Sequence, residues 1–170
     1  MRRPGMMLGT VEHPVQGEML KVGDHAPDFH LKADDWKIKS QADYEGKVKI
    51  FSIVPSLDTR VCAAQTRRFN QEAAALSENV VILTVSADLP YAQRRWCAAE
   101  GIDRVETLSD HFDMNFSDAY GVHVTDMRIC QRSVFVVDQH NVVQLAQYVP
   151  VMGDEVDFDA ALAKASALIG

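Results

Sequence analysis

The sequence predicts an α/β fold in which a mixed β-sheet is covered by helices on both faces. Two continuous apolar stretches, 48–54 and 80–86, are rich in β-branched residues and have the length of buried strands. Each is followed by a segment whose apolar residues recur with a helical period, over 60–76 and 90–100. Strands that alternate with helices in this way form parallel βαβ units.

The first part of the chain reads as short extended segments joined by turns. Residues 8–11 and 15–20 are two short runs separated by a proline-containing turn, which predicts an N-terminal β-hairpin. Residues 29–31 and 36–38 alternate with period two on either side of a polar turn and predict a further pair of strands. Residues 1–7 have no such pattern, and we expect them to be disordered.

The two central helices differ in their expected buried faces. In the first, a single helical stripe is formed by Val61, Ala64, Arg68, Phe69, Ala73 and Leu76. In the second, the stripe consists of Ala92, Trp96 and Ala99. Cys97 lies off that stripe, so its thiol is expected to be reachable rather than buried. Gly101 suits the left-handed residue that ends a helix.

The remaining elements complete a sheet covered on both sides. We expect a short strand at 105–108, a helix at 110–120, a hairpin of strands 132–138 and 142–148, and a closing amphipathic helix at 158–169. Together with the two βαβ units, these elements are typical of the thioredoxin-like arrangement.

The composition is that of an ordinary globular protein. Of the 170 residues, 47% are hydrophobic and 24% charged, and the net charge of −7 argues against a broad nucleic-acid surface. No apolar run approaches the ~20 residues of a membrane-spanning helix, and no signal-peptide core is apparent. We therefore expect a cytoplasmic protein with no nucleic-acid or membrane partner. Without a linker or repeat, residues 1–170 are expected to form a single domain.

The cysteines and histidines do not form a metal-site pattern. Cys62, Cys97 and Cys130 are too few and too widely spaced for a disulfide scaffold, and there is no C-x-x-C pair. The six histidines are scattered, and none pairs with another ligand at i, i+4. We expect neither a metal nor a cofactor.

The junction between the first central strand and its helix holds the most informative residues. Pro55 stops strand pairing because it lacks an N–H group, and Asp58 and Thr59 are both good N-cap residues. Cys62 then falls in the first helical turn, where unpaired N–H groups and the helix dipole favour a thiolate. The alternative is a small buried apolar cysteine, which is what an isolated cysteine usually is. The combination of strand, proline, cap and cysteine favours a reactive one.

A thiolate at this position, with a second accessible cysteine on the next helix, suits the reduction of a peroxide. Attack on the O–O bond gives a sulfenic acid, which a neighbouring thiol condenses to a disulfide. Thr59 can hydrogen-bond the thiolate and an incoming peroxide oxygen, and a buried cation would stabilise charge on the leaving oxygen. No histidine lies near Cys62 in the sequence, so cysteine–histidine acyl transfer is a weak candidate.

The segment Pro55–Cys62 matches the P-x-x-x-T-x-x-C signature of the peroxiredoxins. The surrounding sequence resembles the bacterial thiol peroxidases, the atypical two-cysteine branch of that family. The matching passages are Ser86–Gln93, Trp96–Gly101, Ala119–Val122 and Asp157–Leu162. The resemblance extends over about residues 8–168, nearly the whole chain.

That resemblance implies a role for each site residue. Cys62 would be the peroxidatic cysteine and Cys97 the resolving cysteine, while Thr59 would supply a hydroxyl and Pro55 would shield the thiolate from solvent. Arg132 matches the active-site arginine of the family. The local pattern alone favours a different interpretation of Arg132, as a surface charge at the end of a strand.

The implied enzyme is a thiol-specific peroxidase that reduces hydrogen peroxide and organic hydroperoxides, including lipid hydroperoxides, to water and alcohols. An intrachain Cys62–Cys97 disulfide would form and be recycled by thioredoxin, and the family works as homodimers whose subunits meet near the active site. A disulfide needs Cα atoms roughly 4.4–6.8 Å apart, whereas these cysteines lie on separate helices. The turn around Cys62 and part of the 90–100 helix should therefore unwind before the bond closes.

Other interpretations stay open at this point. Cys130 lies where the family commonly has an apolar residue, and we expect it to be a packing cysteine; a secondary oxidation or mixed-disulfide role is the alternative. The protein could also be a redox sensor that passes its disulfide to another protein, or an inert thioredoxin-like binding module. A sensor would lack sustained peroxide turnover, and a binding module would have an unreactive Cys62.

Overall fold

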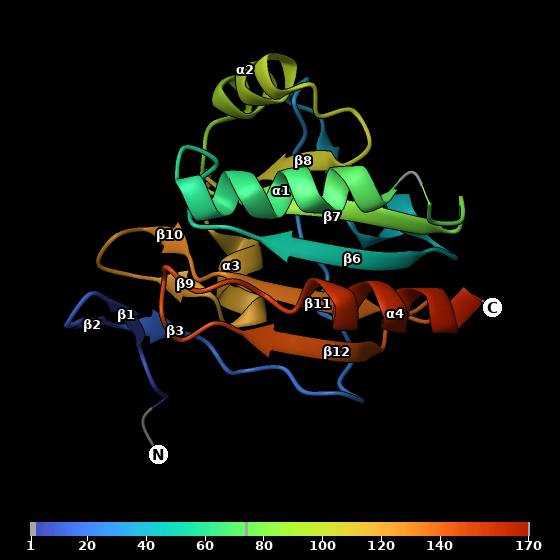
Figure 1. The fold of residues 1–170 in the computed structure, drawn as a ribbon. Coiled ribbons are helices and arrows are strands. Elements are labelled where there is room, and N and C mark those ends of the chain that lie inside the picture. Colours follow the sequence, from blue (N-terminus) through green and yellow to red (C-terminus); the bar gives the residue numbers. More distant parts are fainter. Residues whose placement is uncertain (1–2, 74, 170) are drawn as a thin grey trace.

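The computed structural model describes residues 3–73 and 75–169 and is built around a seven-stranded mixed sheet (Figure 1). Its strands follow the order β12-β11-β6-β7-β8-β4-β5. The parallel neighbours are β6 (Val48–Ile53), β7 (Val80–Ser86) and β8 (Glu106–Ser109). The antiparallel strands are β4 (Leu31–Lys32), β5 (Ile38–Lys39), β11 (Ser133–Val137) and β12 (Val143–Tyr148). The predicted mixed α/β sheet is confirmed.

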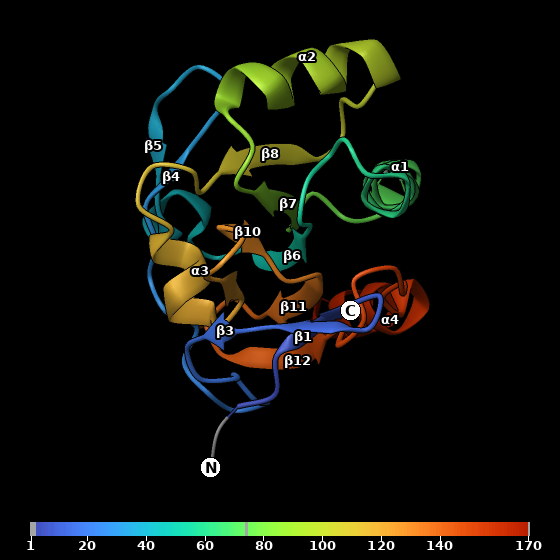
Figure 2. The same ribbon diagram turned by 90° about the vertical axis from the view of Figure 1, so that its left-hand side faces the viewer.

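The helices cover both faces of this sheet. Helix α1 (Arg60–Ala73) joins β6 to β7, and α2 (Pro90–Glu100) joins β7 to β8, as the sequence predicts. Figure 2 shows α1 and α4 (Phe158–Ile169) on one face, α3 (Asn115–Tyr120) on the other, and α2 beyond β8. A short 3-10 helix, η1 (Gln41–Tyr44), precedes β6.

Alternate residues of β6 point to opposite faces because side chains alternate along a strand. On the face of α1 and α4, Val48 and Ile50 pack in a cluster with Phe69. On the face of α3, Phe51 and Ile53 pack in a cluster that contains the remaining aromatic core. Its rings include Phe29, Phe116, Tyr120 and Phe135. The sheet is therefore buried on both sides, which explains why β6 reads as a continuous apolar run.

An N-terminal hairpin is present, but its bounds differ from those predicted. Strands β1 (Met6–Leu8) and β2 (Val11–His13) pair through a turn at Gly9 and Thr10, and not across the proline turn. The next strand, β3 (Val15–Gln16), pairs with β9 (His123–Val124), which pairs with β10 (Ile129–Cys130). The partner of β3 lies more than 100 residues away in the chain, so no local pattern indicated that pairing.

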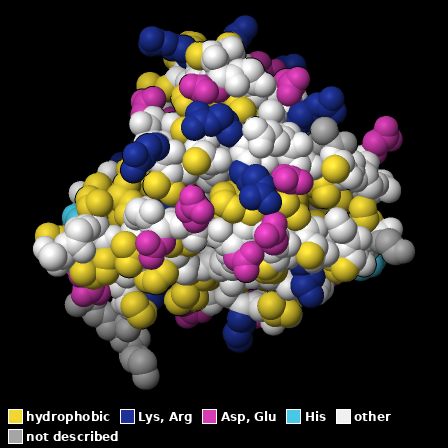
Figure 3. Space-filling model, in the orientation of Figure 1, with side chains coloured by type: hydrophobic (Ala, Val, Ile, Leu, Met, Phe, Trp, Pro, Cys, Tyr) yellow, Lys and Arg dark blue, Asp and Glu magenta, His cyan; other side chains and the backbone are white. Residues whose placement is uncertain are grey.

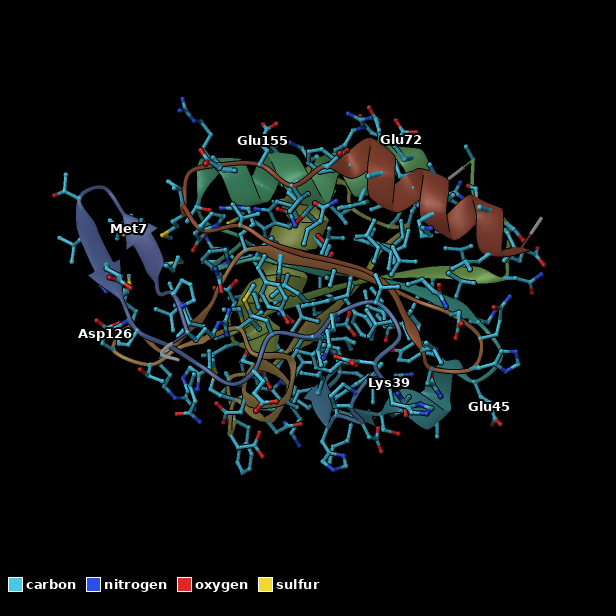
Figure 4. The ribbon with its side chains drawn as sticks, turned by 90° about the horizontal axis from the view of Figure 1, so that it is seen from below. Met7, Lys39, Glu45, Glu72, Asp126 and Glu155 are labelled. Carbon is cyan, nitrogen blue, oxygen red and sulfur yellow. The ribbon has the colours of Figure 1, made fainter. Side chains whose placement is uncertain are left out.

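The expectation of disorder for residues 1–7 is wrong from Arg3 onward, while residues 1–2 lie outside the described residues. Met6 is fully buried, and Met7 is in strand β1. Figure 4 shows Met7 on the hairpin at the same end of the molecule as Asp126, and His13 Nδ1 lies 2.8 Å from the carboxylate of Asp126. This segment is ordered by contacts with residues distant in the chain, and its composition gives no sign of those contacts.

Helix α3 begins at Asn115, five residues later than the predicted start at position 110. Residues 110–114 form a turn in which Met114 has a positive φ of 57°. The buried carboxylate of Asp110 accepts hydrogen bonds from the N–H groups of Phe116 (3.2 Å) and Ser117 (2.8 Å). Asp110 therefore accepts the N–H groups of the first helical turn from outside the helix and does not become part of it. The periodicity of apolar residues does not reveal this side-chain bonding.

Both predicted helical stripes require correction. Helix α1 buries Cys62, Gln65, Thr66 and Phe69 in place of Val61, Ala64 and Arg68. Helix α2 buries Pro90 and Gln93, while Ala92 and Ala99 are exposed. In both helices the buried face differs from the predicted one because a glutamine is buried and forms a hydrogen bond with a serine of the sheet. Gln65 donates to Ser52 Oγ (2.8 Å), and Gln93 donates to Ser86 Oγ (3.0 Å).

The surface carries charges of both signs. In Figure 3, Lys and Arg side chains are interspersed with Asp and Glu side chains over the face that carries α1 and α2. Hydrophobic side chains gather at the left of that view, toward the N-terminal hairpin, where Leu8 and Val11 are exposed. Within 3–73 and 75–169, no helix is long and apolar enough to cross a membrane, and no group of three or more His, Cys, Asp or Glu could hold a metal ion.

Two glycines that end helices allow a matched test of packing. Gly121 ends α3 with φ +71°, and a Cβ there would clash with the carbonyl oxygen of Glu18. Gly101 ends α2 with φ +68°, and a Cβ there would meet nothing within 4 Å. We expect Gly101→Ala to lower the free energy of unfolding by about 1 kcal/mol and Gly121→Ala by about 3 kcal/mol or more, because a backbone clash adds to the strain. Urea denaturation measures both, and equal losses would contradict the close packing at Gly121.

Candidate active site

Four sequence-predicted residues lie at or beside one edge of the sheet, where β6 ends and β11 begins. Ile53, the last residue of β6, pairs with Val85 of β7 and with Ser133 of β11. Pro55 and Thr59 follow β6, Cys62 begins the helix after them, and Arg132 immediately precedes β11. The carboxyl end of a parallel strand at such a switch point is where α/β sheets place binding residues.

Cys62 is the third residue of α1 and is fully buried. Its N–H donates to Thr59 Oγ1 (3.3 Å), and Thr59 O accepts the helical bond from Ala63 N (2.9 Å). Thr59 is therefore the N-cap residue, one of the two that the sequence offered. Cys62 packs in a small cluster with Val54 and Leu57.

The hydroxyl hydrogen of Thr59 is used within the turn. Thr59 Oγ1 donates to the carbonyl oxygen of Ser56 (3.2 Å) while it accepts from Cys62 N. A threonine hydroxyl has one hydrogen to donate, so it must rotate before it can bond a thiolate or a peroxide oxygen. Pro55, four residues earlier, is buried at the start of the same loop.

Arg132 is buried, with 1% of its surface exposed, so its interpretation as a strand-end surface charge is wrong. Its Nη1 donates to Gln65 Oε1 (3.1 Å), and its Nε and Nη2 donate to the carbonyl oxygen of Met152 (3.3 and 3.1 Å). Gln65 lies three residues after Cys62 on the same buried face of α1. In the described part of the chain no carboxylate pairs with Arg132. Its acceptors are neutral, so its positive charge is not cancelled locally.

The N-terminal hairpin holds the loop that supplies the acceptor for Arg132. Met7 N donates to the carbonyl oxygen of Pro150 (2.7 Å), and Met152 N donates to that of Met7 (2.9 Å). Met152 then presents its own carbonyl oxygen to the guanidinium. A segment that the sequence indicated to be disordered is thus part of the support of the site.

Asp88 is a residue of this edge to which sequence reasoning assigned no role. It follows β7, and its carboxylate accepts hydrogen bonds from Ser56 Oγ (2.8 Å), Leu57 N (2.9 Å) and Ser86 Oγ (2.8 Å). The signal in the sequence is an acidic residue directly after a buried strand. Because β6 and β7 are parallel neighbours, residues that follow them meet at the same edge.

Cys97 lies elsewhere, in the second half of α2. It is half-buried, and its Sγ is 3.9 Å from Thr107 Oγ1. It opens on a cavity of about 600 Å³ between α2, the end of α1 and the start of β7, lined also by Ala73, Leu76, Arg94 and Ile102. Burial raises the pKa of the Cys97 thiol. Cys97 is thus neither fully buried nor fully exposed, and it borders this cavity.

Cys62 and Cys97 are free thiols in separate packing environments. Cys97 packs against the cluster on the face of α1 and α4, whereas Cys62 belongs to the cluster of Val54 and Leu57. Trp96 contacts both clusters. The two cysteine-bearing segments are thus neighbours, with the indole of Trp96 packed against the surroundings of both thiols.

Cys130, in β10, is fully buried in the core on the face of α3. Its Sγ lies 3.1 Å from Ser117 Oγ, and burial raises the pKa of its thiol. This position fits the predicted packing role. Among hydrogen bonds of residues 3–73 and 75–169, none joins a histidine to a cysteine.

A family model described as the AhpC/TSA family matches residues 22–146.

The chain belongs to the AhpC/TSA family.

Among curated relatives, a thiol peroxidase of Oceanobacillus iheyensis is 53% identical over 86% of this chain and 88% of the relative. A thiol peroxidase of Bacillus subtilis is 51% identical over 90% of this chain and 91% of the relative. A crystal structure of a peroxiredoxin-like protein from Aquifex aeolicus has a TM-score of 0.90 and 32% identity, covering 98% of each chain. The resemblance to bacterial thiol peroxidases, the enzyme class it implies and the thioredoxin-like fold are confirmed at the level of the family.

The support of Arg132 by Gln65 can be tested through stability. We expect Gln65→Leu to lower the free energy of unfolding by about 1–3 kcal/mol, because it leaves buried groups of Arg132 and Ser52 without their partner. Gln71, exposed on the same helix, is the matched control, and Gln71→Leu should change stability by less than about 0.5 kcal/mol. Guanidinium denaturation of both variants gives the comparison. Equal stability of the two would show that the Gln65 bonds contribute nothing.

Proposed function

We propose that this protein is a thiol peroxidase that reduces hydrogen peroxide and organic hydroperoxides through Cys62. The observation that carries the proposal is the placement of Cys62 in the first turn of α1, one helical turn from the glutamine that binds a buried arginine without a carboxylate partner. The dipole of α1 and the charge of Arg132 both favour negative charge at this edge. Such a site stabilises a thiolate and, during reaction, the charge on a departing oxygen.

The first step is a nucleophilic displacement on oxygen. The Cys62 thiolate attacks one peroxide oxygen, the O–O bond breaks, and the other oxygen leaves with the electron pair and takes up a proton as water or alcohol. Cys62 becomes a sulfenic acid. Thr59 would donate to the peroxide once its hydroxyl has turned from Ser56, and Pro55 would limit the access of water. Because Cys62 is fully buried, the apolar side chains packed against it must move aside to admit the oxidant, while the turn that caps α1 stays formed.

The second step is the formation of a Cys62–Cys97 disulfide. The Cys97 thiolate attacks the sulfur of the sulfenic acid, the S–O bond breaks, and hydroxide leaves and is protonated to water. Burial raises the pKa of the Cys97 thiol in the folded helix, so unwinding part of α2 would also make its thiolate easier to form. The packing of each thiol in its own cluster supports the need for this opening.

Two electrons are needed to return the enzyme to its thiol state. Thioredoxin would supply them by thiol–disulfide exchange, in which its own dithiol becomes a disulfide and Cys62 and Cys97 are regenerated. The proposed setting is the cytoplasm, where cysteines are kept reduced, in keeping with three free thiols in this chain.

A homodimer is part of the proposal, and an exposed aromatic patch supports it. The patch consists of Trp36, Leu89, Tyr91 and Phe112, with Trp36 in contact with Tyr91 at a centroid distance of 5.1 Å. Leu89 directly follows Asp88, so the patch adjoins the edge that carries Cys62. Tyr91 and Phe112 are 68% and 73% exposed, and such aromatic side chains are enriched where proteins associate.

The reaction is tested by adding one equivalent of hydrogen peroxide to the reduced protein and mapping the products by mass spectrometry. We expect a Cys62–Cys97 disulfide within single chains, and sustained peroxide consumption when thioredoxin and its reductase are supplied. Cys62→Ser should abolish consumption. Cys97→Ser should complete one turnover and then stop, because the sulfenic acid has no resolving thiol.

Cys130→Ser is the matched control, since Cys130 lies in the core away from this chemistry, and its peroxide consumption should equal that of the wild type. A Cys62–Cys130 linkage or an interchain bond would overturn the assignment of Cys97. Oxidation of Cys62 without sustained consumption would instead identify a redox sensor.

The patch is tested by sedimentation equilibrium. The 18.9-kDa chain should sediment as a species of twice that mass, and Phe112→Ser should shift it toward the monomer because the variant removes an exposed aromatic contact. Val22→Ser is the control, because Val22 is also exposed but lies outside the patch. A wild-type protein that sediments as a monomer would contradict the homodimer.

A further inference from the structure

A relay of hydrogen bonds connects Asp88 to Cys62. The carboxylate of Asp88 accepts from Ser56 Oγ (2.8 Å) and from Leu57 N (2.9 Å), and so holds the first half of the turn. The carbonyl oxygen of Ser56 accepts from Thr59 Oγ1 (3.2 Å), which in turn accepts from Cys62 N (3.3 Å). The position of the helix cap at Cys62 therefore depends on groups that Asp88 holds.

The same carboxylate is connected to α2. Ser86 Oγ donates to Asp88 Oδ2 (2.8 Å) and accepts from Gln93 Nε2 (3.0 Å). The carbonyl oxygen of Asp88 also accepts from Ser109 Oγ (2.5 Å), which fixes its backbone against the end of β8. Gln93 is fully buried and precedes Cys97 by four residues, one turn of the same helix. The relay thus runs from the turn of Cys62 to the helix that carries Cys97.

We propose that Asp88 is a positioning residue whose carboxylate joins the turn of Cys62 to the start of α2, so that the two cysteine-bearing segments open as one unit. This inference rests on the proposed peroxidase function and deepens it. Asp88 touches neither the peroxide nor a reacting sulfur; it acts through Ser56, Leu57 and Ser86. An ionised carboxylate forms stronger hydrogen bonds than a neutral acceptor does, so this single side chain sets how readily the turn opens.

The proposal has opposite consequences for the two chemical steps. Peroxide attack needs the turn closed, with Thr59 capping the helix and the helix dipole directed at Cys62. Disulfide formation needs the turn open. Weakening the contacts of Asp88 should slow the first step and leave the second equal or faster. A sulfenic acid that is resolved sooner is also less available to a second peroxide, which would convert it to a sulfinic acid.

The test uses rapid-quench mass spectrometry of the full-length protein with hydrogen peroxide, which separates thiol, sulfenic, disulfide and sulfinic forms of Cys62. In Asp88→Ala we expect the second-order rate constant of peroxide attack to fall about tenfold or more, the change that one charge-assisted hydrogen bond supplies. The first-order rate constant of disulfide closure should be equal or higher. The sulfinic fraction at a fixed peroxide excess should be lower than in the wild type.

The conservative variant Asp88→Asn retains one carbonyl oxygen, and it should recover part of the lost rate of peroxide attack. Ser56→Ala removes the partner of Asp88 Oδ1 and should change both rate constants in the same directions as Asp88→Ala. It also keeps the inference testable where Asp88→Ala does not fold. The effects of Ser56→Ala and Asp88→Ala should be less than additive in the double variant, because both remove the hydrogen bond between Ser56 and Asp88.

Asp138 is the matched control. Its carboxylate also accepts three hydrogen bonds, from His140 N (2.9 Å), Val142 N (2.9 Å) and Gln144 Nε2 (2.8 Å), but it lies in the hairpin between β11 and β12. Asp138→Ala should lose stability without changing either rate constant. A purely structural role of Asp88 would give that same result.

The wild type in the same experiment separates this inference from the proposed function. A wild type that forms the disulfide, together with an Asp88→Ala variant whose two rate constants are unchanged, overturns the role of Asp88 alone. A fall of both rate constants by the same factor overturns it as well. A wild type whose Cys62 does not react with peroxide overturns the proposed function itself.

Discussion

The site depends above all on burying the positive charge of Arg132 without neutralising it. Burial of a cation is unfavourable unless its N–H groups are hydrogen-bonded, and here neutral oxygens of Gln65 and Met152 accept those bonds. One acceptor comes from α1 and the other from a loop that the N-terminal hairpin holds. A helix from the first half of the chain and a loop near its C-terminal end therefore meet at one guanidinium, and no acceptor among the described residues is a carboxylate.

The N-terminus of α1 adds its own partial positive charge to that of Arg132. Thr59 caps α1 by accepting the N–H of Cys62, so the cysteine is held by its backbone while its sulfur packs among apolar side chains. A thiol in such a position is protected from water, yet the turn that protects it is made of a few hydrogen bonds at a helix end. Helix ends are among the first parts of a fold to open. The short segment that shields the Cys62 thiol from water is thus also the one that opens most readily.

The sequence predicted the parallel core well, because its signals are local. The bounds of β7 and α2 agree with the prediction, and the proline, cap and cysteine after β6 lie as expected. The prediction failed where a residue's order or burial depends on a partner distant in the chain. Met7 is ordered by the loop at Met152, and the buried faces of α1 and α2 are set by Gln65 and Gln93, whose polar ends find partners on the sheet. Asp88 looked like an ordinary loop acid for the same reason.

Trp96 gives the molecule a property that neither thiol has alone. Its indole packs against the cluster of Cys62 and against the cluster that contacts Cys97. Trp96 and Cys97 are consecutive residues of α2. Indole fluorescence depends on the polarity and quenching groups around the ring, and a sulfur that changes its oxidation state or its partner alters both. The protein therefore carries an intrinsic fluorophore at the boundary between the surroundings of Cys62 and those of Cys97, and it needs no attached dye to report on them.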